Sequence, residues 1–440
     1  MSAVYDKLIP ALKALLPHDS LDELGRAVAF IRRLREIHAS AFVWSVVMSR
    51  FGNGRPAFEQ ARQWYQRLGG LEIWPRPFQM RFKNERAVRL FERAFTTAVT
   101  PWRDPTRRKV RHPLMRYFPD VVAWDSTLMQ VDDSLKKVFK GTRGAKASLK
   151  ATLAISVFGL LPLFAQLVPG HRHDMILFPP LDLFRQGTLL LFDKGFACYD
   201  RLRTIQNAGH FYLCPMRLNG NARIVAVRNA PAYVRKALRK GEPVFLRDVL
   251  AATKRIARPW DLDVLVRPQA NATDRTLIRT RLVITPGPEN EQRPYLTNLS
   301  PTQWRPEALR ELYRLRWQVE LVYKELKQDL NLEVLNSKDR HAVQVFAWAS
   351  LVALALSRTV TAWLCPLVKL VGLAPRLRPA LMTRALRGTI RLLARALTAP
   401  TRRALEYLSL FTEEILIEIR ARDQNRSDSF KRVIPLLEAS

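Results

Sequence analysis

The stretch from residue 306 to residue 330, PEALRELYRLRWQVELVYKELKQDL, carries the strongest pattern in this chain. Apolar residues recur at intervals of three and four, which predicts one amphipathic helix. At about 100° per residue, one face of this helix is apolar. Tyr313, Arg316, Glu320 and Lys327 fall within an arc of about 60° on the opposite face. The helix therefore presents a carboxylate among cations and a phenol.

Two interpretations of this polar face are open. It can be a solvated surface with ion pairs four residues apart, such as Glu320 with Lys324. It can also belong to a site, and two carboxylates elsewhere favour this. Asp125 lies within the strand-like run VVAWDSTLMQV, and Asp193 follows the apolar residues of LFDKGF. A carboxylate flanked by hydrophobic residues is costly to bury unless it is paired or binds a metal.

These three carboxylates suit phosphoryl transfer. Open α/β sheets build their sites at strand ends. Two strand carboxylates and one helix carboxylate supply the oxygen ligands that Mg²⁺ prefers. Two such ions can stabilise the attacking and the leaving oxygen of an in-line displacement. Asp125, Asp193 and Glu320 are therefore the candidate metal ligands and catalytic residues.

The spacing Tyr313-x2-Arg316-x3-Glu320-x6-Lys327 resembles the Tyr-x2-Arg-x3-Glu-x6-Lys signature of DDE transposases of the insertion-sequence-four family. Asp125 in WDST and Asp193 in DKGF resemble the contexts of the first and second catalytic Asp of that family. The long interval between Asp193 and Glu320 resembles the family's β-rich insertion. The resemblance covers roughly residues 120–340.

The resemblance implies an α/β fold with a ribonuclease-H-like core, in which a mixed five-stranded sheet is packed with helices. It implies two Mg²⁺ ions per active site, with Mn²⁺ able to substitute, held by Asp125, Asp193 and Glu320. It also implies cut-and-paste transposition of an insertion sequence, by end cleavage, a hairpin intermediate and strand transfer. Tyr313, Arg316 and Lys327 would bind phosphates of the transposon ends. The implied partners are the terminal inverted repeats and target DNA, bound by a homodimer in a synaptic complex.

The composition agrees with a nucleic-acid partner. In 440 residues, 72 Lys and Arg stand against 39 Asp and Glu, which gives a net charge of +33. Such an excess attracts a polyanion, although an Arg-rich genome would produce the same excess. The three cysteines show no metal-ligand spacing, and their odd number suits a reducing compartment.

The location expected from the sequence is the bacterial cytoplasm, in association with the nucleoid and not with a membrane. The N-terminus has no basic segment followed by a long apolar core, so we expect no signal peptide. The longest uncharged apolar run, residues 342–356, is shorter than the roughly 20 residues of a membrane-spanning helix and is expected to be a buried helix.

Changes in composition and periodicity along the chain divide it into five regions, and the resemblance implies the role of each. A helical N-terminal DNA-binding region with a basic linker (1–118) is followed by the first part of the core (119–217). A β-rich insertion (218–300), the core helix with the catalytic Glu (301–340) and a helical C-terminal region for DNA contacts or dimerisation (341–440) complete the chain. Short alternating segments separated by Pro, Gly and Asn indicate the insertion.

Several other residues are weaker candidates. Asp132 and Asp133 compete with Asp125 for the role of first ligand, but a turn or cap role fits them better. His171, His173 and Asp174 fit a loop better than a metal cluster, and Asp174 and Asp200 suit helix N-caps. Trp260 and Trp304 are candidates to stack on a flipped base, although a core role is the simpler expectation.

Two other functions remain open. A metal-dependent nuclease on the same core would lack strand transfer. A catalytically silent DNA-binding protein derived from a transposase would lack metal-dependent cleavage.

Overall fold

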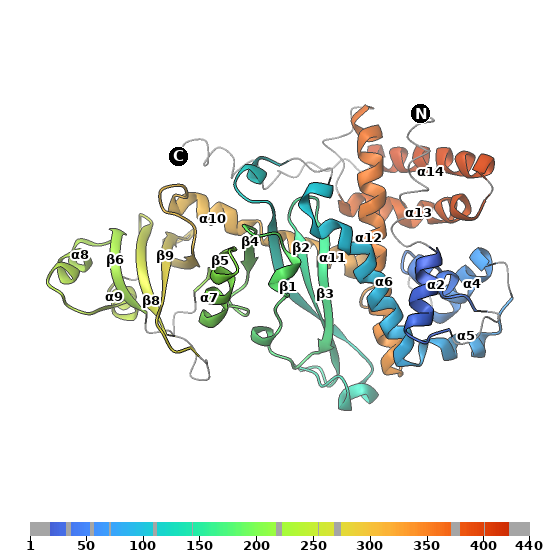
Figure 1. The fold of residues 1–440 in the computed structure, drawn as a ribbon, viewed down its shortest axis with the longest axis horizontal. Helices are drawn as coiled ribbons and strands as arrows, with labels where there is room; N and C mark the ends of the chain where they lie inside the picture. The colour runs from blue at the N-terminus through green and yellow to red at the C-terminus, as the bar shows by residue number, and fades with distance from the viewer. Residues whose placement is uncertain are drawn as a thin grey trace.

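A single mixed sheet of ten strands forms the backbone of the fold. The computed structural model describes residues 18–31, 37–52, 57–69, 72–108, 112–142, 144–216, 222–253, 255–267, 274–370, 379–399 and 401–421. The strands follow the order β3-β2-β1-β4-β5-β10-β9-β8-β6-β7 across the sheet. Figure 1 shows the chain spread along this order, with the helices of both termini gathered at one end.

The first five strands form one half of the sheet. They are β1 (Val121–Gln130), β2 (Ser148–Ser156), β3 (Leu161–Pro169), β4 (Leu189–Phe192) and β5 (Phe211–Pro215). β1, β2 and β3 pair antiparallel, whereas β4 pairs parallel with both β1 and β5. β2 and β4 are buried along their whole length, as expected for apolar runs covered on both faces. β2 and β3 form a hairpin that turns at Gly159, whose φ of 87° suits glycine.

The second half of the sheet comes from the predicted β-rich insertion. Its strands are β6 (Arg223–Asn229), β7 (Val244–Phe245), β8 (Trp260–Val266), β9 (Ile278–Pro286) and β10 (Gln292–Thr297), and its helices are α8 (Ala232–Arg239) and α9 (Leu246–Ala252). β10 pairs antiparallel with β5. The insertion therefore extends the five-stranded sheet instead of forming a sheet of its own, because the free edge of β5 accepts another strand.

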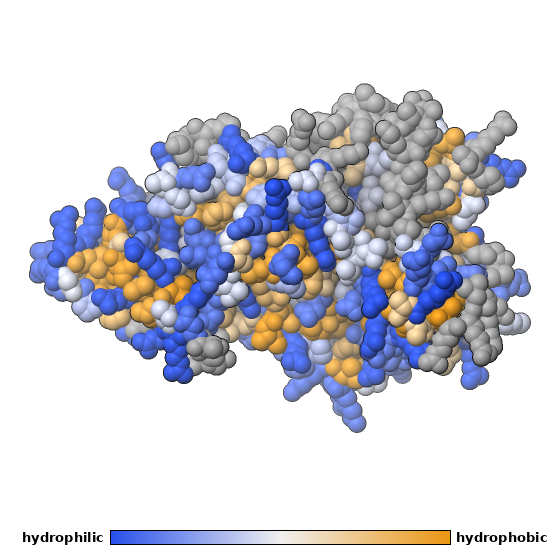
Figure 2. All heavy atoms as spheres, viewed as in Figure 1, coloured by the Kyte–Doolittle hydropathy of each residue, from blue (hydrophilic) through white to orange (hydrophobic). Residues whose placement is uncertain are grey.

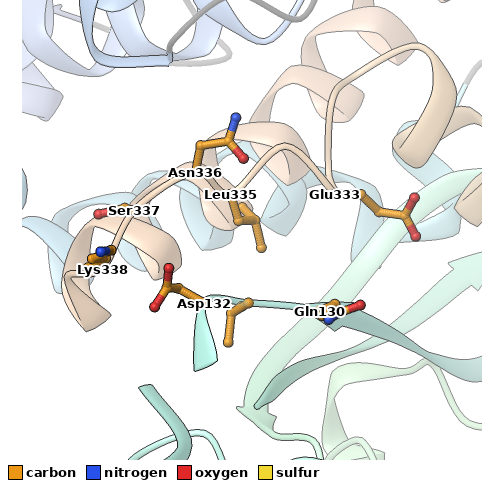
Figure 3. Close-up of a pocket in the computed structure, with 8 residues that line it drawn as sticks. Gln130, Asp132, Glu333, Leu335, Asn336, Ser337 and Lys338 are labelled. Atoms are coloured by element: carbon orange, nitrogen blue, oxygen red, sulfur yellow. The ribbon is translucent and has the colours of Figure 1, made fainter. Parts of the chain in front are cut away.

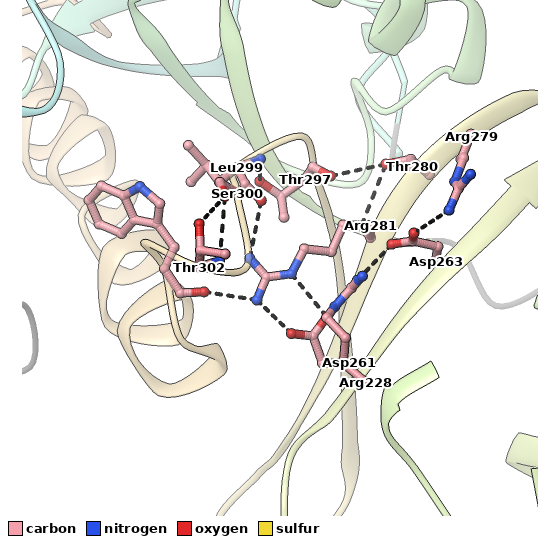
Figure 4. Close-up of polar contacts among 11 residues, drawn as sticks. Arg228, Asp261, Asp263, Arg279, Thr280, Arg281, Thr297, Leu299, Ser300 and Thr302 are labelled. Carbon is pink, nitrogen blue, oxygen red and sulfur yellow. Dashed lines mark hydrogen bonds and ion pairs between the residues drawn. The ribbon is translucent and has the colours of Figure 1, made fainter. Parts of the chain in front are cut away.

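A buried ion pair joins the insertion to the loop that precedes residue 306. Arg281 of β9 donates two hydrogen bonds to Asp261 of β8, at 3.0 and 2.8 Å. The same guanidinium donates to the carbonyl oxygens of Leu299 and Trp304, at 3.1 and 2.8 Å (Figure 4). Forked arginine donors suit such a fixed arrangement. The loop before residue 306 is thereby held against the sheet.

Most of the helices come from the N-terminal and C-terminal parts of the chain. The N-terminal helices are α2 (His18–Ala27), α3 (Ala39–Ser49), α4 (Ala57–Gly69), α5 (Pro75–Phe82) and α6 (Glu85–Arg103). The later ones are α7 (Tyr199–Asn207), α10 (Pro306–Arg314), α11 (Trp317–Gln328), α12 (Arg340–Leu370), α13 (Pro379–Thr398) and α14 (Thr401–Ala421). Short 3-10 turns lie at Pro105–Arg107, Pro113–Arg116, Asp133–Lys137, Asp174–Ile176 and Leu181–Leu183.

The expected single helix over 306–330 is wrong in one respect, because it breaks into α10 and α11. Around Leu315 and Arg316 the backbone bonds span three residues instead of four, as in Arg316 N–H to Tyr313 O and Val319 N–H to Arg316 O. A tighter local turn of this kind often marks a functional position. Its consequence here is that Arg316 stands at the start of α11.

The two faces of the sheet bury two separate cores. Along β1, Val121 and Ala123 join the core that contains α6, α11 and α12, whereas Val122 and Trp124 join the core on the opposite face. This is the alternation that a strand imposes. The expected buried helix at 342–356 is confirmed within α12. Residues Arg340–Cys365 form the one helix in the described part of the chain that is long and apolar enough to span a membrane, and 83% of its most apolar window is buried.

A second buried ion pair ties α11 to the C-terminal helices. Arg358 of α12 donates two hydrogen bonds to Glu325 of α11, at 2.8 and 2.7 Å, and its Nε donates to the carbonyl of Leu160 at 3.0 Å. The hydroxyl of Thr383 on α13 also donates to Glu325. Both charged side chains are almost fully buried, with exposures of 1% and 2%. This network fixes α11 against the hairpin of β2 and β3.

We expect Arg358→Met to lower the free energy of unfolding by about 3–5 kcal/mol, because it leaves the Glu325 carboxylate buried without its partner. Urea unfolding followed by circular dichroism measures the change. The double variant Arg358→Met with Glu325→Met is the control, and it should recover most of the loss. A single variant within about 0.5 kcal/mol of wild type, the range typical of surface substitutions, would contradict the role of this pair.

Candidate active site

The pairing of β1 with β4 brings two of the predicted acids together. Trp124 of β1 is the register partner of Phe192 of β4, and the two strands run parallel. Asp125 and Asp193 directly follow these partners in the sequence. Neighbouring strands lie about 4.8 Å apart, so the two acids sit side by side. By the alternation of β1, Asp125 shares the face of Ala123, against which α11 packs.

The third acid, Glu320, arrives on α11. The phenol of Tyr323, one turn later, donates to the carbonyl oxygens of Asp125 and Ala151, at 2.9 and 3.1 Å. These bonds lock α11 across β1 and β2. The apolar side of α11 is buried at Val319 and Val322, as the periodicity predicts. The polar face that carries Glu320 is thereby held over the strand that carries Asp125.

Arg316 bridges the acids of the strand and the helix. One guanidinium nitrogen donates to Oδ2 of Asp125 at 2.9 Å, and the other donates to Oε1 of Glu320 at 2.6 Å. The Arg316 side chain is 14% exposed, and that of Asp125 is 19% exposed. The Nε of Arg316 is buried and has no hydrogen-bond partner among the described residues. The alternative pair of Glu320 with Lys324 is absent from the ion pairs of the described residues.

The acids also interact electrostatically. The pKa of Asp125 is raised from 3.8 to about 6, chiefly because burial penalises its charged form. The negative charges of Glu320 and Asp193 raise this pKa further, while the amide of Ser126 and the charge of Arg316 lower it. Glu320 and Asp193 therefore both lie near enough to Asp125 to affect its charge.

We compare the free energy of unfolding of Asp125→Asn with that of wild type. We expect the difference, in favour of the variant, to increase by up to about 2–3 kcal/mol between about pH 4 and pH 7. The folded chain binds the proton on Asp125 more tightly than the unfolded chain, so wild type loses stability as pH rises through this window. Urea midpoints of the DNA-free protein in metal-free buffer measure the difference. Asp132→Asn is the control, because the pKa of exposed Asp132 is lowered instead. A difference that stays constant with pH would contradict this electrostatic account.

Of the other two residues of the pattern, Tyr313 lies beside Arg316, and Lys327 reaches β1, where its Nζ donates to the carbonyl oxygen of Leu128 at 3.5 Å. Tyr313 packs on Tyr295, with ring centroids 5.0 Å apart, and burial strongly raises the pKa of its phenol. The negative charge of Asp193 contributes to that rise, which places Tyr313 near the second acid. Lys327 forms an ion pair with Glu333 at 2.7 Å. Each residue of the Tyr-Arg-Glu-Lys pattern thus borders the acids or the end of β1.

Asp174 is a site neighbour that the sequence pattern missed as such. The expected N-cap role is wrong for Asp174, because His173 caps that 3-10 turn. The carboxylate of Asp174 instead accepts hydrogen bonds from the hydroxyl of Ser126 at 3.0 Å and from the buried Lys150 at 2.7 Å. A Cβ on Gly195 would lie 3.4 Å from Asp174 Oδ2 and 3.8 Å from Asp193 Oδ2. Asp174 and Asp193 therefore both approach Gly195, which places a fourth carboxylate at the edge of the site.

The position of Asp174 near the site could not be predicted from the sequence, because it depends on an ion pair with Lys150, which is distant in the chain. The strand-like position of Lys150, inside an otherwise apolar run, is the one signal that could have pointed to a buried partner. Asp200 is also not an N-cap, since the position before that helix is Cys198.

The remaining weak candidates take structural roles. Asp132 caps the turn at Asp133–Lys137 by accepting from Ser134 N–H, as the cap interpretation expects. Trp304 is 1% exposed and stacks on Phe118, and Trp260 is 6% exposed, so the core role is confirmed for both. The side chain of His173 accepts from Met175 N–H within its turn.

A pocket lies at the C-terminal end of β1, away from the three acids. It is formed where the end of β1, at Gln130 and Asp132, faces the loop that carries Glu333, Leu335 and Lys338 (Figure 3). The three acids do not line it. Elsewhere on the visible face, hydrophilic residues project along much of the outline, including the end formed by β6 and α8 (Figure 2).

The donor set suits a hard divalent cation, because all three acids offer carboxylate oxygens. In the present arrangement, however, the described residues contain no group of three or more Asp, Glu, His or Cys side chains placed to hold a metal ion. Arg316 explains this, since its guanidinium engages Asp125 and Glu320. The residues fit a metal by chemistry, and Arg316 holds the position that a cation would take between two of them.

Comparisons with known proteins identify the family of the chain. The family described as Transposase DDE domain matches residues 116–356, which contain all three acids. The chain is similar to the transposase for insertion sequence element IS231F of Bacillus thuringiensis subsp. israelensis, at 22% identity over 80% of each chain. It is similar to the transposase for insertion sequence element IS1151 of Clostridium perfringens, at 20% identity over 80% of each chain. A short segment, 13% of the chain, is 38% identical to the putative transposase InsL of IS186A from Escherichia coli (strain K12).

Proposed function

Because the chain belongs to the family of transposases that carry the DDE domain, we propose that it moves an insertion sequence by cut-and-paste transposition. The steps proposed are cleavage at the element ends, a hairpin intermediate and strand transfer. The observation that carries the proposal is the placement of Asp125 and Asp193 side by side on parallel strands, with Glu320 joined to Asp125 through Arg316.

The architecture supports a ribonuclease-H-like core. β3-β2-β1-β4-β5 form a mixed five-stranded unit, in which antiparallel β1, β2 and β3 continue into parallel β4 and β5. The first acid lies on β1 and the second follows β4. α11 packs on β1 and β2 and carries the third acid.

We propose that Asp125, Asp193 and Glu320 hold two Mg²⁺ ions per active site, with Mn²⁺ able to substitute. When bound, such ions make a DNA phosphate more electrophilic and stabilise the charge of the displacement. The residues of the chain position this chemistry, because Tyr323 fixes α11 over β1. No covalent protein nucleophile is needed, because water or a DNA 3′-hydroxyl attacks the phosphate.

The proposed partner is DNA, through the terminal inverted repeats of the element and the target. Arg316 and Lys327 offer a forked donor and a point charge for phosphates, with Tyr313 beside them. The net charge of +33 supports a polyanion partner. At the far end of the sheet, α8 adds an exposed basic surface of Arg235, Lys236, Arg239 and Lys240. We also propose a homodimer in the synaptic complex and action at the nucleoid of a bacterial cytoplasm.

We expect Asp125→Ala, Asp193→Ala or Glu320→Gln to reduce end cleavage by at least about a hundredfold while DNA binding remains, because each removes a ligand of the reaction centre. A gel assay on a duplex that carries the inverted repeats flanking the gene, with matched gel shifts, measures both. Asp132→Asn is the control, since Asp132 caps a turn and should retain activity. Full cleavage by any one of the three variants would remove that residue from the site.

Strand transfer separates a transposase from a nuclease on the same core. Supplied with a precleaved end that has a free 3′-hydroxyl and with target DNA, a transposase joins the two. Products that are only cut and never joined would favour the nuclease. Absence of metal-dependent cleavage in the wild-type chain would favour a silent DNA-binding protein.

A further inference from the structure

The guanidinium of Arg316 occupies a place between two acids that the reaction needs free. It reaches Asp125 on β1 at 2.9 Å and Glu320 on α11 at 2.6 Å. Both contacts are charge-assisted, and the side chains involved are at most about one-third exposed. Two carboxylates brought together in this half-buried place repel each other, and a cation between them offsets the repulsion. In this arrangement Arg316 is that cation.

The local backbone sets Arg316 in this position. The tightened turn between α10 and α11 places its Cα at the start of α11, one turn before Glu320. The ring of Tyr313 lies 5.8 Å from the guanidinium carbon and supports the cation from the side. A straight helix through 306–330 would alter this geometry, because the break changes the rotation between Tyr313 and Glu320.

The ion pairs leave Arg316 incompletely satisfied. Its Nε is buried and donates to no acceptor in the part of the chain that the structure describes, although the guanidinium has five N–H donors. A buried donor without a partner weakens the arrangement that buries it. A phosphate offers two oxygens in the geometry of the arginine fork and can therefore compete for this side chain.

We propose that Arg316 is a built-in substitute cation: it keeps Asp125 and Glu320 from binding divalent metal until a DNA phosphate draws the guanidinium away. Metal binding is then coupled to DNA binding, so the acids are loaded only when a substrate is present. The inference rests on the proposed function for the identity of the metal ligands. It adds an order of events and a second role for Arg316 before it contacts DNA.

The test measures Mn²⁺ binding to the full-length chain without DNA, by the electron paramagnetic resonance signal of free Mn²⁺. We expect Arg316→Gln to bind Mn²⁺ at least about tenfold more tightly than wild type, which corresponds to removal of a competing interaction of about 1.4 kcal/mol. Arg316→Lys should be intermediate, because an ammonium lacks the fork that bridges both acids. Equal affinities of Arg316→Gln and wild type would overturn the proposal.

Arg314→Gln is the matched control. Arg314 lies two residues earlier, is half exposed and pairs with Glu311 at 3.1 Å, away from the acids. This variant should bind Mn²⁺ as wild type does. An increase equal to that of Arg316→Gln would show that net charge alone sets the affinity and would overturn the proposal. Circular dichroism melts of all variants confirm that the folded chains are compared.

Adding a duplex with the flanking inverted repeats completes the test. Wild type should then approach the affinity of Arg316→Gln, while Arg316→Gln itself changes little. A gain with DNA that is equally large in both proteins would contradict the substitute-cation role.

Double variants distinguish an error in the proposed metal ligands from an error in the proposed role of Arg316. Asp125→Asn and Glu320→Gln, each combined with Arg316→Gln, should lose the tight Mn²⁺ site. If tight binding persists, the metal lies elsewhere and the proposed metal ligands are wrong. If the double variants lose tight Mn²⁺ binding but wild type binds Mn²⁺ as tightly as Arg316→Gln, the proposed metal ligands are correct and only the role of Arg316 is wrong.

Discussion

The parallel pairing of β1 with β4 is the constraint on which the site depends. The register that joins Trp124 to Phe192 sets Asp125 beside Asp193, and both belong to runs that the sheet buries. Their repulsion and the cost of burial raise the pKa of Asp125, so this is an electrostatically unfavourable point of the fold. The guanidinium of Arg316 offsets that strain in the DNA-free chain. Strain at such a position is typical of residues kept for function.

The rest of the fold positions α11 against this pair of strands. Tyr323 bonds to β1 and β2, and the buried pair of Glu325 with Arg358 ties α11 to α12. Arg281 and Asp261 brace the loop that leads into α10. Three buried networks therefore converge on the short stretch between Trp304 and Glu325. Polar groups buried in this way are costly unless they are satisfied, so each network specifies one arrangement of the helix.

Much of this could be predicted from the sequence, and the exceptions have physical causes. The periodicity of 306–330 predicted the apolar face of α11 and placed Arg316 on the same face as Glu320, and the apolar runs around Asp125 and Asp193 predicted their strands. Lys324 was the wrong partner, because Glu320 pairs with Arg316. The break at Leu315 and Arg316 was not predictable, because helix periodicity does not register a tightened turn. The continuation of the sheet from β5 into β10 was also missed, since strand pairing between distant segments depends on free edges and not on local pattern. The partner of Lys150 is long-range for the same reason.

The position of Mn²⁺ in crystals of the chain bound to its element end tests the central claim most directly. Anomalous diffraction at the manganese edge locates the ions without reference to the sequence. The account predicts ions held by Asp125, Asp193 and Glu320, with the guanidinium of Arg316 on a DNA phosphate. Ions bound away from these acids, or Arg316 still bridging Asp125 and Glu320 in the loaded complex, would contradict it.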